Sequence, residues 1–70
     1  MLKRHLAQAE EHVATGYKNI ARQFRLIAKL QRGGHDTAKA RAILDQFEDL
    51  QEMHIADRGR ILRELIEESK

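Results

Sequence analysis

The chain has 70 residues, which is enough for one domain, and it contains neither cysteine nor proline. The absence of cysteine excludes a disulfide framework and a thiolate metal site, and the net charge of only +2 is unlike that of most nucleic-acid-binding modules. No apolar run approaches the roughly 18 residues of a membrane span, and the basic N-terminus lacks the apolar core of a signal peptide, so we expect no membrane partner and a cytoplasmic protein.

Residues 2–32 are predicted to form a first helix. Apolar side chains recur there every three or four residues, and Leu6, Val13, Ile20 and Ile27 are seven residues apart, as along the seam of a coiled coil. Gly16 lies inside this helix, where glycine costs about 1 kcal/mol relative to alanine. We therefore expect another helix to approach closely at Gly16.

Basic side chains in the same helix form a separate row with spacings of four, three, four and three residues. They fall on one solvent-facing side of the helix, along roughly 20 Å, and could follow a phosphate backbone. The alternative is an ordinary solvated face, and no aromatic side chains interleave with the row for base stacking. We call this row the basic ridge; it consists of Lys18, Arg22, Arg25, Lys29 and Arg32. Nucleic-acid binding through it is an alternative function, and not the favoured one.

Residues 33–36 are predicted to be a turn between two helices. Gly33 is expected to adopt the left-handed conformation that closes a Schellman-type cap, because glycine carries no Cβ. Asp36 is expected to accept a hydrogen bond from the first free N–H groups of the next helix. A connection this short makes the two helices antiparallel neighbours.

A second helix is predicted from about residue 37 to residue 67. Its apolar stripe includes Ile43, Phe47 and Leu50, and it resumes at Ile61 and Leu65 after a polar interval. On its outer side lie four carboxylates that could meet the basic ridge of another copy or a basic partner, although a solvated face is the simpler reading. We call them the acidic patch; they are Asp45, Glu48, Asp49 and Glu52.

Folding the chain about Gly34 pairs residues whose numbers add up to about 67, so that apolar positions match and His12 comes towards His54. Two helices alone make a thin core, and chains of this size usually need a staple or a partner. We therefore predict an all-α antiparallel two-helix hairpin, spanning residues 1–70, that dimerises into a four-helix bundle. The alternative is a hairpin that docks on a different protein. The predicted oligomer seam consists of Leu6, Val13, Ile20, Phe24, Ile27, Ile43, Phe47, Leu50, Ile61 and Leu65.

His12, His54 and Asp57 are the only candidate metal ligands. Imidazole and carboxylate suit transition metals, but no HxxxH, HExxH or ExxH spacing places a chelating pair on one helix. The alternative is a polar side chain that specifies the register of the seam. With no nucleophile beside a base and no phosphate loop, we expect neither an enzyme nor a cofactor. The leading function is a non-enzymatic interaction or regulatory module.

Three sequence pieces carry a resemblance: His12-Val13-Ala14-Thr15-Gly16, Gly34-His35-Asp36-Thr37-Ala38, and residues 47–58, which contain Phe47, His54 and Arg58. Together they resemble a group of small uncharacterised bacterial proteins along nearly the full chain. The resemblance implies a helical hairpin and brings no assigned activity.

Overall fold

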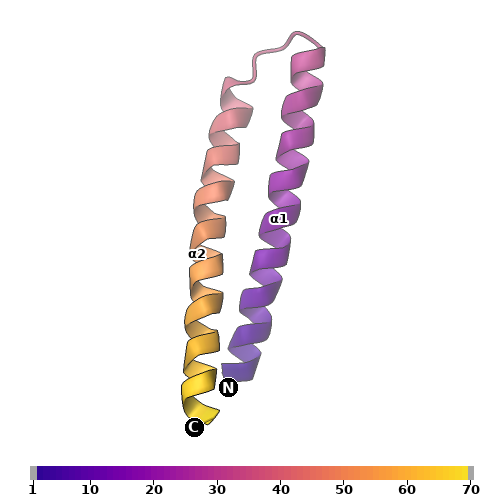
Figure 1. Cartoon of the computed structure of the whole chain (residues 1–70). Helices are drawn as coiled ribbons and strands as arrows, with labels where there is room; N and C mark the ends of the chain where they lie inside the picture. The colour runs from indigo at the N-terminus through magenta and orange to yellow at the C-terminus, as the bar shows by residue number, and fades with distance from the viewer. Residues whose placement is uncertain (1, 70) are drawn as a thin grey trace.

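Two long helices lie side by side in opposite directions (Figure 1), as seen in a computed structural model that describes residues 2–69. Helix α1 spans Leu2–Arg32 and helix α2 spans Ala38–Ser69, and they form a rod whose Cα extents are 57 × 14 × 13 Å. The prediction of an all-α antiparallel hairpin is confirmed. The end residues of the predicted domain, 1 and 70, lie outside the described residues. Over residues 2–69, neither helix has an apolar stretch that could cross a bilayer.

The connection between the helices is a Schellman motif centred on Gly34. The His35 N–H donates to the Leu30 carbonyl at 2.9 Å, and the Gly34 N–H donates to the Gln31 carbonyl at 3.1 Å. Gly34 has a φ of 73°, so the prediction that Gly33 takes the left-handed conformation was wrong by one residue. The reason is that the Gly33 N–H still donates to the Lys29 carbonyl and thus continues the helical pattern.

Helix α2 begins with the predicted aspartate cap. The Ala38 N–H donates to Asp36 Oδ1 at 3.0 Å, which satisfies one of the free donors at the helix start. Thr37 adds a second local contact, because its hydroxyl accepts a hydrogen bond from Arg41 Nε at 3.0 Å. Both contacts lie within residues 36–41 and fix the start of α2 locally.

Small and branched apolar side chains form the core between the helices. The buried ones are Ala9, Val13, Ile27, Ala40 and Leu44. Of the predicted oligomer seam, Val13 and Ile27 are buried within the hairpin, and five residues are half-buried: Leu6, Ile20, Phe47, Ile61 and Leu65. The remaining three, Phe24, Ile43 and Leu50, are exposed. The hairpin thus uses most of the predicted seam internally.

Two glutamines, Gln23 and Gln51, lie in the core. The seam predicted from the sequence consists only of apolar residues and does not include them. Gln23 Nε2 donates to the Ala40 carbonyl and Gln51 Nε2 donates to the Val13 carbonyl, both at 2.8 Å. Each helix therefore gives one buried amide to the backbone of the other helix. Buried polar groups need such partners, since an unpaired amide in the core costs about 1–3 kcal/mol.

Candidate functional site

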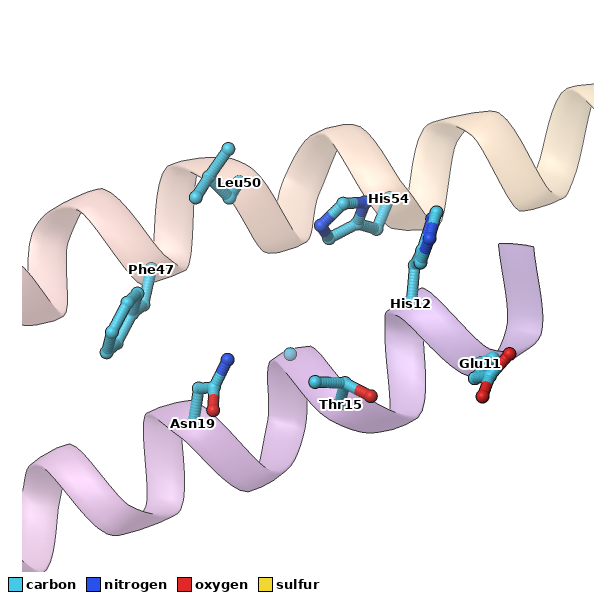
Figure 2. Close-up of a pocket in the computed structure, with 8 residues that line it drawn as sticks. Glu11, His12, Thr15, Asn19, Phe47, Leu50 and His54 are labelled. Carbon is cyan, nitrogen blue, oxygen red and sulfur yellow. The ribbon is translucent and has the colours of Figure 1, made fainter. Parts of the chain in front are cut away.

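His12 and His54 lie next to each other between the two helices (Figure 2), and their ring centroids are 5.2 Å apart with the planes tilted by 47°. The predicted register, which brings His12 towards His54, is confirmed. His54 is half-buried and His12 is exposed. The pair is therefore both positioned by the fold and reachable from solvent.

One turn away, the side-chain amide of Gln51 lies directly over Gly16. A Cβ atom at Gly16 would overlap this amide, so a side chain of α2 fills the space that the glycine leaves, and the predicted close approach of the helix itself stays a prediction. Gln51 Oε1 is buried and has no hydrogen-bond partner among the described residues. Gln51 was missed at the sequence level, although a signal exists: it stands seven residues after Leu44 and seven before Arg58, both on the inner side of α2.

Two open cavities meet at the histidine pair, and both are lined by His12 and His54. The first has a volume of about 440 Å³, and Thr15, Asn19 and Phe47 line it as well (Figure 2). The second has a volume of about 380 Å³ and extends towards the chain ends. Its further lining residues include His5, Asp57, Arg60 and Glu64. The histidines thus lie between a cavity of mixed lining, which includes Phe47, Leu50 and Glu11, and a cavity lined by several charged side chains.

Only two of the three candidate metal ligands are brought together. Asp57 lines the second cavity, but its Oδ1 is 3.4 Å from Arg60 Nη2 in an exposed ion pair. Over residues 2–69, no group of three or more His, Cys, Asp or Glu side chains is arranged to hold a metal ion. A site with three ligands already in place is therefore not present in the described part of the chain.

The basic ridge and the acidic patch both lie on the outside of the hairpin. All five ridge residues and all four residues of the patch are exposed. Within the described residues, the only ion pair joins Arg60 to Asp57, so the ridge cations have no carboxylate partner in the hairpin. Both surfaces are open to charged partners.

Large apolar side chains remain exposed on two opposite flanks of the hairpin. On one flank, each exposed apolar residue comes directly after a residue that faces the other helix. Tyr17 follows Gly16 and Phe24 follows Gln23 in this way. Both aromatic rings therefore point outward, and 55% of the surface of each residue is exposed. We call it the aromatic flank; it consists of Tyr17, Phe24, Ile55, Leu62 and Ile66.

The opposite flank contains residues that precede an inner residue, as His12 precedes Val13. The cavities open there, and we call it the grooved flank. Its exposed apolar side chains are Leu26, Ile43, Leu50 and Met53. Exposed apolar side chains thus lie on both sides of the core.

Comparisons with protein-family models, with curated proteins and with solved structures find no match to this chain. The resemblance to small bacterial hairpin proteins therefore stays a prediction. The function has to be inferred from the surfaces described above.

Proposed function

We propose that the chain is a non-enzymatic interaction module that acts as a homodimer, in which two hairpins pack through their aromatic flanks into a four-helix bundle. The observation that carries this proposal is the aromatic flank itself. Its five large apolar side chains are at least 37% exposed, and nothing within residues 2–69 covers them. Covering this surface would complete a core that the single hairpin leaves thin.

A second copy is the partner we propose because the two helices carry opposite charge. Residues 1–34 hold seven Lys or Arg and two Glu, a net +5, whereas residues 35–70 hold six Lys or Arg and nine Asp or Glu, a net −3. In a symmetric pair with α1 of one copy on α2 of the other, the basic ridge and the acidic patch would lie beside each other twice. Ala14, Ala21 and Ala28 are small enough to permit close packing between the aromatic flank and the ridge.

Replacing Phe24 with aspartate is expected to weaken the dimer by at least about a hundredfold, because a charge would have to be buried in the new core. Sedimentation equilibrium should give twice the 8.1 kDa chain mass for the native protein and a shift to monomer for Phe24→Asp. Met53→Asp is the matched control, since Met53 is 63% exposed on the grooved flank and its substitution should leave the dimer intact.

A monomeric native protein, with a Tm that does not change over a hundredfold range of concentration, would refute the homodimer. If Met53→Asp dissociates the dimer and Phe24→Asp does not, the interface lies on the grooved flank and our choice of surface is wrong.

Nucleic-acid binding is a second candidate function, and the observation that favours it is the unpaired basic ridge. Five exposed cations that have no carboxylate partner within residues 2–69 follow one side of α1, and phosphate contacts from such a row need no specific pocket. Exposed aromatic rings at Tyr17 and Phe24 lie on the neighbouring flank, although alanines separate them from the ridge.

The combined substitution of Arg22, Arg25 and Lys29 by glutamine tests this candidate. If the native protein binds nucleic acid through the ridge, the anisotropy of labelled RNA or duplex DNA should report binding that weakens steeply as the salt concentration rises. Removing three phosphate contacts should lower the slope of log K against log salt by about 2–3. The control is the replacement by glutamine of three cations outside the ridge, Lys3, Lys39 and Arg63. It removes the same charge and should change nucleic-acid binding little. Absence of binding at low salt would reduce the ridge to a solvated face.

A further inference from the structure

We propose that His12 and His54 form a two-imidazole site for a divalent transition-metal ion, such as Zn²⁺, Ni²⁺ or Cu²⁺, which joins α1 to α2. Imidazole nitrogen is a preferred ligand of these three ions. The site lies within a single hairpin. It therefore does not depend on the homodimer, and the two proposals can fail separately.

The separation of the rings is the first argument. In a tetrahedral zinc site, each histidine nitrogen is about 2.0–2.1 Å from the metal, and the ring centroid lies about 1 Å further out, so two ligating rings have centroids about 5 Å apart. The centroids of His12 and His54 are 5.2 Å apart. Two such rings could therefore bind one ion after side-chain rotations, without a change in the helix packing.

The availability of the rings is the second argument. In the part of the chain that the structure describes, neither imidazole is hydrogen-bonded to another protein group. The two cavities beside them give an ion and its waters access from the grooved flank. The ring nitrogens are thus not committed to a structural contact.

Carboxylates near the pair could supply a further ligand or orient the rings. Glu11 lines the first cavity, and Asp57 and Glu64 line the second. Asp57 pairs with Arg60, but both side chains are more than half exposed, and pairs of this kind contribute little, so Asp57 can exchange that partner for a metal ion. Waters would occupy the remaining positions.

An ion bound by His12 and His54 would stabilise the folded hairpin. The ligands come from different helices, so the site exists only in the folded hairpin, and an ion that binds it raises the stability by mass action. For a chain of 70 residues, free ion at roughly ten times Kd adds about 1.4 kcal/mol and should raise the Tm by about 10 °C. The ion would act as the staple that a cysteine-free chain otherwise lacks.

The test is a titration of the metal-free full chain with each of the three ions. Calorimetry should give one ion per chain. With Zn²⁺, proton NMR should show shifts of the His12 and His54 ring signals, and the signal of His35 in the turn should stay in place as a control within the same molecule. The proposal would be overturned if calorimetry detected no binding of any of the three ions and Zn²⁺ caused no shift of the His12 and His54 ring signals.

Variants separate this site from binding elsewhere. His12→Gln and His54→Gln keep a polar side chain of similar size, and each should abolish the metal-dependent rise in Tm, whereas His35→Gln in the turn should preserve it. A rise that persists in both of the first two variants would place the ion at another site and would refute the assignment, even if the native chain binds metal.

Discussion

Replacement of Gly16 with alanine is expected to destabilise the hairpin, and the same replacement of Gly59 is expected to stabilise it. Alanine improves helix propensity by about 1 kcal/mol at either position. At Gly16, however, the added methyl group would displace the Gln51 amide and break its hydrogen bond to the Val13 carbonyl, which should cost more than the propensity gain. A methyl group at Gly59 would meet only the end of the Arg63 side chain. Arg63 Nη1 would be 3.8 Å from the added Cβ atom, which is an ordinary van der Waals distance.

After the gain in propensity is subtracted, we expect Gly16→Ala to lower the free energy of unfolding by about 1–2 kcal/mol and Gly59→Ala to raise it by about 0.5–1 kcal/mol. Urea denaturation followed by circular dichroism measures both. The combination of Gly16→Ala with Gln51→Ala should be less destabilising than the two separate changes predict, because the shortened side chain leaves room for the methyl group. Strict additivity in this double-mutant cycle would contradict the proposed contact.

Replacement of Ile27 with aspartate is expected to abolish folding. Ile27 is 6% exposed and packs in a buried cluster with Ala40 and Leu44. A carboxylate there would be buried without a partner, at a cost of several kcal/mol, which is a large part of the stability of a small domain. The helical signal in circular dichroism at 25 °C should be lost.

The neighbouring Leu26 provides a matched control for this substitution. It is 43% exposed on the grooved flank, so Leu26→Asp introduces the same charge one residue away into a solvated position and should leave the hairpin folded. A folded Ile27→Asp variant, or equal losses of helicity in both variants, would show that the described core does not hold the helices together.

Much of the architecture follows from the sequence because helical periodicity and turn chemistry are local properties. The seven-residue spacing of Leu6, Val13, Ile20 and Ile27 predicts α1, and Asp36 marks the beginning of α2. The pairing of His12 with His54 also follows, since a short turn leaves little freedom in how two antiparallel helices align.

The tertiary structure decided which of two neighbouring side chains faces the partner helix. The predicted seam includes Phe24, but the inner position belongs to the neighbouring Gln23, and the Phe24 ring points outward. A buried glutamine is stable only where a carbonyl of the other helix stands at hydrogen-bond distance, as Ala40 does for Gln23. That distance depends on how the two helices are aligned and how closely they approach, which no local pattern in either helix contains.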